Sequence, residues 1–141
     1  GLGVAATAGY EACITGEVPP RAEREAQSLP TDRLLGDPEW SELVKDLMTE
    51  VVAIANALNL NVASALIEKN IESTREMGAY RASTLIDFDR GHPLELDSLF
   101  HAPLRIAKRA NIETPRLEML DRVLQQLQPI SAKRRPSNSV Q

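Results

Sequence analysis

The sequence predicts an all-α fold, a compact bundle of several helices. In several segments apolar residues recur at steps of three and four, as on one face of a helix. Asp37-Pro38 and Thr114-Pro115 each place a capping residue before a proline, which is typical of a helix start. No alternating apolar and polar run is long enough to predict a strand. We therefore expect one helical domain over 1–128, followed by a polar, basic tail over 129–141.

In the N-terminal half, residues 2–14 are small and apolar and predict a helix that is packed on most sides. Residues 15–38 are rich in glycine and proline and predict a loop-rich connection, with a single helical turn at "RAEREAQ". A long helix should then run from about 38 to 58. Its apolar face is formed by Leu43, Leu47, Val51, Ile54 and Leu58.

The C-terminal half predicts three more helices. The first spans 62–77 and is stopped by Gly78. After a short segment, "YRASTLIDFDRG", the second spans about 94–110 and should be kinked at Pro103. The last follows Thr114-Pro115, and its apolar stripe consists of Leu117, Leu120, Val123, Leu124 and Leu127.

Composition and missing motifs exclude several functions. The formal net charge of -4 argues against a general nucleic-acid binder, and no apolar run is long enough to span a membrane. Cys13 is the only cysteine, so no intrachain disulfide can form, and a reducing, cytoplasmic location is expected. No glycine-rich phosphate motif is present, and His92 and His101 lack the spacing of a helical metal site. We expect neither a metal nor a cofactor on this chain alone.

Two carboxylates, Glu95 and Asp97, follow a turn that contains Gly91 and Pro93. Carboxylates are favoured at helix starts, and spacing alone favours this structural explanation. The alternative is that Glu95 faces a pocket and handles a proton. Asp97 lies two residues on, about 200° around a helix, so it should point away from whatever Glu95 faces and is interpreted as structural.

An ordered set of segments gives these residues a further meaning. It comprises "LMTEVVAIANALNL" with Glu50, Ala82-Ser83-Thr84 with Asp87, Gly91 to Asp97, and Ala110 to Pro115. In this order and spacing, over about residues 40–127, the set resembles the C-terminal, substrate-side domain of ketopantoate reductase (2-dehydropantoate 2-reductase).

The resemblance implies a function and two site residues. It implies an NADPH-dependent oxidoreductase that reduces a 2-keto acid such as 2-dehydropantoate, with NADPH held by a nucleotide-binding domain upstream. Glu95 would be the catalytic acid beside the substrate, because the ketone oxygen must gain a proton when hydride arrives. Ser83 would bind the substrate acid, although its hydroxyl could instead bond a local turn.

The sequence also departs from the family pattern. The family's lysine and two asparagines would fall at Gly1, Ala5 and Gly9, and its Asn-Gly pair at Phe100-His101. These replacements imply a pocket of similar shape that has lost much of its polar lining. The alternative function is therefore a standalone domain for small-molecule binding, dimerisation or cofactor-independent catalysis. Its expected partners are a keto acid or another apolar carbonyl ligand and, through apolar helix faces, a second copy of the chain.

Overall fold

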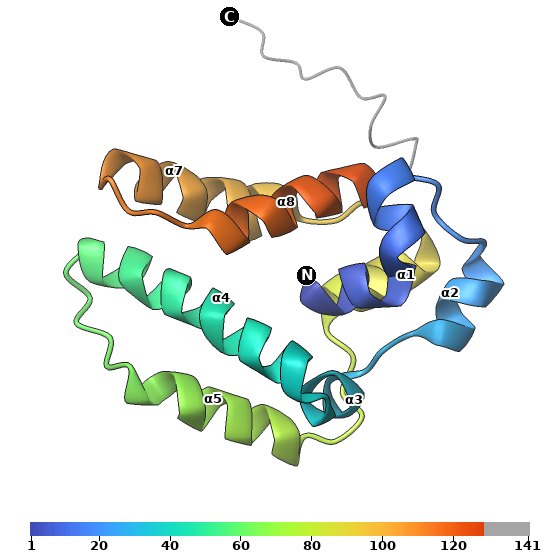
Figure 1. The fold of residues 1–141 in the computed structure, drawn as a ribbon, viewed down its shortest axis with the longest axis horizontal. Coiled ribbons are helices and arrows are strands. Elements are labelled where there is room, and N and C mark those ends of the chain that lie inside the picture. The colour runs from blue at the N-terminus through green and yellow to red at the C-terminus, as the bar shows by residue number, and fades with distance from the viewer. Residues whose placement is uncertain (129–141) are drawn as a thin grey trace, which may run out of the picture.

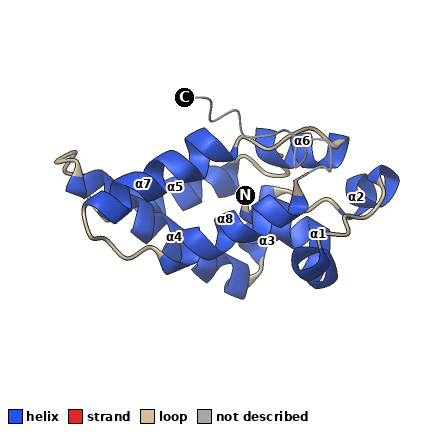
Figure 2. Cartoon of the chain, turned by 90° about the horizontal axis from the view of Figure 1, so that it is seen from above, coloured by secondary structure: helices blue, strands red, loops and turns tan. Residues whose placement is uncertain are grey.

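The computed structural model describes residues 1–128, apart from the side chains of residues 10, 11 and 25–27. Within that range the chain is helical and has no strand (Figures 1 and 2). This confirms the predicted all-α fold. The predicted tail at 129–141 lies outside the described residues. The elements are α1 (Leu2–Thr15), α2 (Arg21–Gln27), α3 (Thr31–Gly36), α4 (Pro38–Ala57), α5 (Ala65–Glu76), α6 (Ser83–Arg90), the π-helical turn η1 (Asp97–His101), α7 (Ala102–Arg109) and α8 (Pro115–Leu127).

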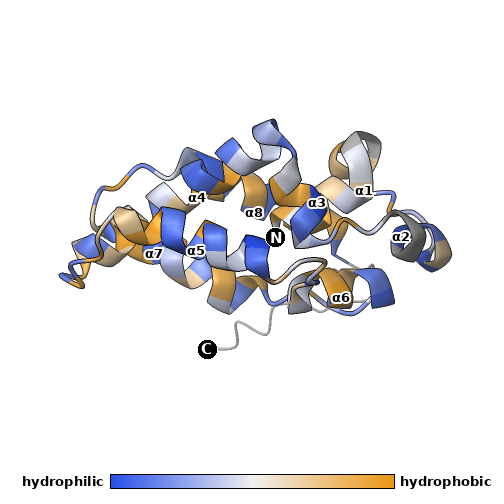
Figure 3. Cartoon of the chain, turned by 90° about the horizontal axis from the view of Figure 1, so that it is seen from below, coloured by the Kyte–Doolittle hydropathy of each residue, from blue (hydrophilic) through white to orange (hydrophobic). Residues whose placement is uncertain are grey.

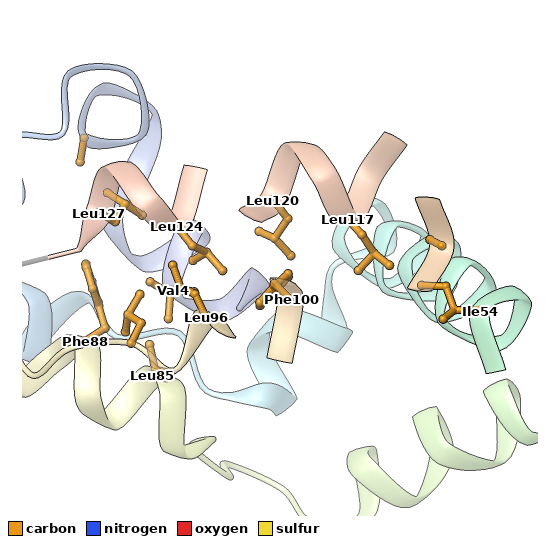
Figure 4. Close-up of a cluster of buried hydrophobic side chains, with 14 residues drawn as sticks. Val4, Ile54, Leu85, Phe88, Leu96, Phe100, Leu117, Leu120, Leu124 and Leu127 are labelled. Atoms are coloured by element: carbon orange, nitrogen blue, oxygen red, sulfur yellow. The ribbon is translucent and has the colours of Figure 1, made fainter. Parts of the chain in front are cut away.

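The core lies where α1 and α8 pack together, with α6 and η1 against them (Figure 4). Val4 of α1 and Leu124 of α8 have no exposed surface, and Phe100 of η1 lies beside them. Complete burial of such side chains contributes about 1.5–3 kcal/mol each. Figure 3 shows hydrophobic and hydrophilic residues interleaved along the same helices, as amphipathic helices on a shared core require.

The two helices with cap-and-proline signals begin where predicted. Asp37 caps α4, because its Oδ1 accepts hydrogen bonds from the backbone N–H groups of Glu39 at 2.9 Å and Trp40 at 3.2 Å. Pro115 begins α8, but the side chain of Thr114 makes no capping bond there. Thr114 is buried, and its Oγ1 has no partner among residues 1–128.

The start of α8 is capped instead by Glu50, from the middle of α4. Its Oε1 accepts from the backbone N–H of Arg116 at 3.0 Å, and its Oε2 accepts from that of Leu117 at 2.9 Å. The guanidinium of Arg116 adds charge compensation, since it lies 3.7 Å from Oε1 and its Nε lies 3.2 Å from Asp46. One buried carboxylate thus satisfies two backbone donors that the helix cannot pair itself.

Several short elements differ from the sequence prediction. The N-terminal helix is not continuous, because Gly9 adopts φ 81° and ψ 168° and breaks α1. The single turn predicted at "RAEREAQ" is the seven-residue helix α2. The sequence predicts no helix at α3 or α6. They contain six and eight residues, too few for an apolar period to be recognised.

The predicted helix over 94–110 begins later than expected. Leu94 and Glu95 are not helical, and the helical path starts at Leu96. The predicted distortion at Pro103 takes the form of a π turn before it, in which the N–H of Ala102 donates to the carbonyl of Asp97. A proline ring crowds the preceding turn, and a wider turn relieves that crowding.

Replacing Glu50 by Gln should lower the free energy of unfolding by about 1–3 kcal/mol, because both capping bonds lose the carboxylate charge in a buried place. Urea denaturation measures the change. The matched control is Glu76→Gln at the exposed end of α5, which should stay within about 0.5 kcal/mol of the unchanged chain. Equal stability of the two variants would show that Glu50 is not the cap of α8.

The two cap positions should respond in opposite ways. Asp37→Ala should cost about 1 kcal/mol of stability, because two N–H groups of α4 lose their acceptor. Thr114→Val should be neutral or stabilising, since it replaces a buried hydroxyl without a partner by a methyl group of the same shape. Thermal unfolding of both variants provides the measurement. A large loss of stability in Thr114→Val would mean that the hydroxyl does cap α8.

Candidate functional site

Glu95 lies on the non-helical segment before η1, between two buried leucines. The side-chain amide of Gln128 fixes this segment: the N–H of Leu94 donates to its Oε1 at 2.9 Å, and its Nε2 donates to the carbonyl of Leu94 at 3.0 Å. Leu94 and Leu96 are both buried, so the side chain of Glu95 faces outward. The Glu95 carboxylate makes no hydrogen bond or ion pair with the residues whose side chains the structure describes. The fold therefore presents an unengaged carboxylate on a fixed backbone.

Ser83 is the first residue of α6 and is also exposed. The neighbours of Ser83 and Glu95 meet in the core, where Leu85, Leu96 and Val4 belong to one cluster (Figure 4). The core thus brings together α6, the segment before η1 and the N-terminal helix α1. Neither Glu95 nor Ser83 lines the large groove described below.

Asp97 has the structural role that was expected of it. Its side chain is exposed and bonds the Nδ1 of His101 at 2.7 Å, one turn further along. His101 also lies 3.0 Å from Asp121 of α8, which in turn accepts from Gln125 at 2.8 Å. This chain of contacts ties the π turn to α8.

Gly1, where the resemblance would place the family lysine, is closely packed against side chains of the core. A Cβ added at Gly1 would lie 2.8 Å from the ζ carbon of Phe100 and 3.0 Å from the Cδ1 of Leu124. The ring of Phe100 therefore occupies the space beside Gly1, and a longer residue would require the ring to move. Ala5 and Gly9, the other two aligned positions, bring no polar side chain.

An apolar groove of about 720 Å³ runs between α1, α4 and α8. Most of its lining is aliphatic or aromatic, and Arg116 is its charged member. The lining comprises Leu2, Ala5, Ala6, Gly9 and Cys13 of α1, Trp40, Leu43 and Leu47 of α4, and Pro115, Arg116, Met119, Leu120 and Val123 of α8. Partial burial raises the pKa of the Cys13 thiol, whose Sγ donates to the carbonyl of Ala5 at 3.6 Å. The volume is in the usual range for small-molecule sites.

The sequence did not place a groove between α1, α4 and α8. Leu43, Leu47 and Leu120 were recognised only as apolar stripe residues of their helices. The remaining signal is the run of small residues in α1, which leaves space opposite α4 and α8.

Two features typical of metal and dinucleotide sites are missing from the described residues. No group of three or more described His, Cys, Asp or Glu side chains is arranged to hold a metal ion. Because the range 1–128 has no strand, it also lacks the glycine turn between strand and helix that holds a dinucleotide pyrophosphate. In the part of the chain that the structure describes, none of the helices has the length and hydropathy to cross a membrane.

Comparisons with known proteins agree on one family. A sequence model described as "Ketopantoate reductase PanE/ApbA C terminal" matches residues 27–128. A 2-dehydropantoate 2-reductase of Nostoc sp. is 33% identical over 90 residues, which is 64% of this chain and 28% of that protein. An uncharacterised protein of Saccharomyces cerevisiae is 31% identical over 83 residues, which is 59% of this chain and 23% of that protein.

The structural comparison gives the same result. The crystal structure of 2-dehydropantoate 2-reductase from Methylococcus capsulatus matches 83% of this chain and 39% of its own, with a TM-score of 0.66 and 26% identity. The matched segments cover about a quarter of the length of each of the two relatives from Nostoc and Saccharomyces. The family match includes Glu50, Ser83 and Glu95 but not the segment with Gly1, Ala5 and Gly9. Since it covers most of the chain, this protein belongs to the ketopantoate reductase C-terminal domain family.

Proposed function

We propose that this chain is the substrate-side helical domain of an NADPH-dependent, ketopantoate reductase-like oxidoreductase. The substrate would be a 2-keto acid such as 2-dehydropantoate, and the product its hydroxy acid. The observation that carries the proposal is Glu95, an unengaged carboxylate that the clamp between Gln128 and Leu94 holds at the surface. NADPH would be held by a separate nucleotide-binding domain, in line with the small share of each relative that this chain covers.

Glu95 would act on the carbonyl oxygen of the substrate. NADPH supplies the hydride that reduces the keto carbon, and the oxygen must then gain a proton. A carboxyl group within hydrogen-bond reach of that oxygen lowers the barrier, either as the donor or by orienting a water that donates. An acid that meets a substrate between two domains is expected to be exposed when its own domain is considered alone, as Glu95 is.

Ser83 would hold the acid group of the substrate. Its hydroxyl lies at the first residue of α6, where backbone N–H groups of the first turn have no intrahelical acceptor. A carboxylate is favoured at such a position by both the N–H groups and the helix dipole. Binding there would set the keto carbon in register for the reaction.

A second candidate function is the binding of an apolar ligand in the groove between α1, α4 and α8. It is favoured by the volume of about 720 Å³ and by the nearly unbroken apolar lining. Gly1, Ala5 and Gly9, where the resemblance would place the family's lysine and asparagines, carry no polar side chain, which supports the same candidate. Exposed Ile14 and Met119, on the two helices beside the groove, also suit contact between two copies of the chain.

Glu95→Gln tests the proposed function. With the nucleotide-binding domain in place, this change should lower kcat/KM for 2-dehydropantoate by tenfold or more, or about 1.4 kcal/mol. The consumption of NADPH measures the rate. Stability should change by less than about 0.5 kcal/mol, because the side chain is exposed. Asp97→Asn is the matched control and should leave kcat/KM within about twofold. A Glu95→Gln enzyme that keeps its kcat/KM would rule out the catalytic role.

The rate at which Cys13 is alkylated can be used to probe the groove, because Cys13 is part of its lining. Because burial raises the pKa of its thiol, less thiolate is present near neutral pH than in a free cysteine of pKa about 8.5. Alkylation by iodoacetamide should therefore be slower than that of free cysteine, and its rate should keep rising at higher pH. Cys13 is the only cysteine, so mass spectrometry of the labelled chain is unambiguous.

The same labelling tests the second candidate function. An apolar carbonyl compound that occupies the groove should slow the reaction further, whereas the chain unfolded in urea should react at the rate of free cysteine. Labelling of the folded chain at that same rate would show that the groove does not shield Cys13.

A further inference from the structure

A polar cavity of about 240 Å³ lies beside α6. Its lining consists of Arg21 of α2, Arg81 just before α6, and Ile86, Asp89 and Arg90 of α6. Neither Glu95 nor Ser83 belongs to it, and it shares no residue with the apolar groove. Four of its five lining residues are charged, so it is suited to a different class of ligand.

Asp89 is the buried member of this cavity, with 3% of its side chain exposed. Its contacts converge on one oxygen: Oδ2 forms an ion pair with Arg81 and accepts from the hydroxyl of Ser28 at 3.0 Å. The guanidinium of Arg81 also donates to that hydroxyl at 2.8 Å. The carboxylate is therefore fixed in place by groups on two separate segments of the chain.

Two buried polar atoms of this network lack a hydrogen-bond partner in the described part of the chain. The Oδ1 of Asp89 and the Nε of Arg81 are buried and have no hydrogen-bond partner among the described side chains and backbone. Buried polar atoms are nearly always paired in folded proteins, with protein, water or a ligand. One leftover atom is an acceptor and the other a donor, so a ligand that satisfies both must offer a donor and an acceptor.

The charges of the lining restrict that ligand further. Arg81 is paired with Asp89, and Arg21 has an interaction of its own. The charge of Arg90 therefore remains as a positive excess that favours an anion. Arg90 is exposed and makes no ion pair with any side chain that the structure describes, so its guanidinium is available to an incoming group. A fully deprotonated anion would nevertheless be repelled by Asp89, because both would be acceptors. An anion with an O–H group of its own can donate to Asp89 instead.

We propose that this cavity binds a small oxyanion that carries an O–H group, of which hydrogen phosphate is the simplest example. Arg81 and Arg90 donate to its charged oxygens, and the Oδ1 of Asp89 accepts its O–H. The cavity volume is many times the ~30 Å³ that one water occupies in the liquid, so a tetrahedral oxyanion fits. The site does not depend on the proposed reductase function, and its test uses no enzyme activity.

Inorganic phosphate and sulfate are the decisive pair of probes. They have the same shape, but near neutral pH phosphate keeps at least one O–H and sulfate has none. Titration calorimetry of the 141-residue chain, at constant ionic strength set with sodium chloride, should show saturable binding of phosphate. Sulfate should bind at least tenfold more weakly, a difference of about 1.4 kcal/mol. Absence of phosphate binding, or equal affinity for both anions, overturns the proposal.

Two variants locate the site. Arg90→Gln should weaken phosphate binding at least fivefold, whereas Arg109→Gln, at an exposed arginine at the end of α7, should leave it unchanged. Asp89→Asn removes the negative charge and supplies an amide donor, so sulfate should then bind about as well as phosphate. If Asp89→Asn does not fold, as shown by circular dichroism, Arg90→Gln and the sulfate comparison still decide. Unchanged phosphate affinity in Arg90→Gln would place any binding elsewhere and refute the site.

Discussion

The fold depends on the carboxylate of Glu50 at the buried start of α8. A helix that begins inside a protein has backbone N–H groups without intrahelical partners, and leaving them unpaired would oppose the packing of α8. Glu50 supplies acceptors for two of them from a residue 66 positions earlier in the chain. Helix α8 in turn contributes Leu117, Leu120, Leu124 and Leu127 to the core. The cap thus connects α4 to the helix against which α1 and η1 pack.

Sequence reasoning succeeded where local signals were strong and long. The helices that begin at Pro38 and Pro115 combine a proline start with several turns of apolar periodicity, and both start where predicted. It failed for α3 and α6, where six or eight residues cannot establish a period. It also assigned the cap of α8 to Thr114, because a sequence shows only neighbours along the chain. The true partner, Glu50, resembles any other acid within a helix until tertiary structure brings it to Arg116 and Leu117.

For the candidate site, too, local sequence signals predict only part of what the structure shows. Glu95 and Ser83 were indicated by the resemblance to a family, not by their local pattern, and the structure adds how Gln128 and the core hold their segments. Both cavities lie between elements that are distant in sequence: Leu2 and Val123 share the apolar groove, and Arg21 and Arg90 share the polar one. Periodicity within one segment cannot show which distant segments pack together, so it did not predict the lining of either cavity.

The clamp between Gln128 and Leu94 has a mechanical consequence. Helix α8 is anchored at its first turn to α4 through Glu50, and immediately after its last turn to the Glu95 segment through Gln128. A helix of 13 residues is about 20 Å long and nearly inextensible. Helix α8 therefore keeps Glu50 of α4 and the segment that carries Glu95 at a fixed separation. A shift of α4, such as one imposed by a partner that binds along its surface, would be carried through α8 to the backbone that positions Glu95.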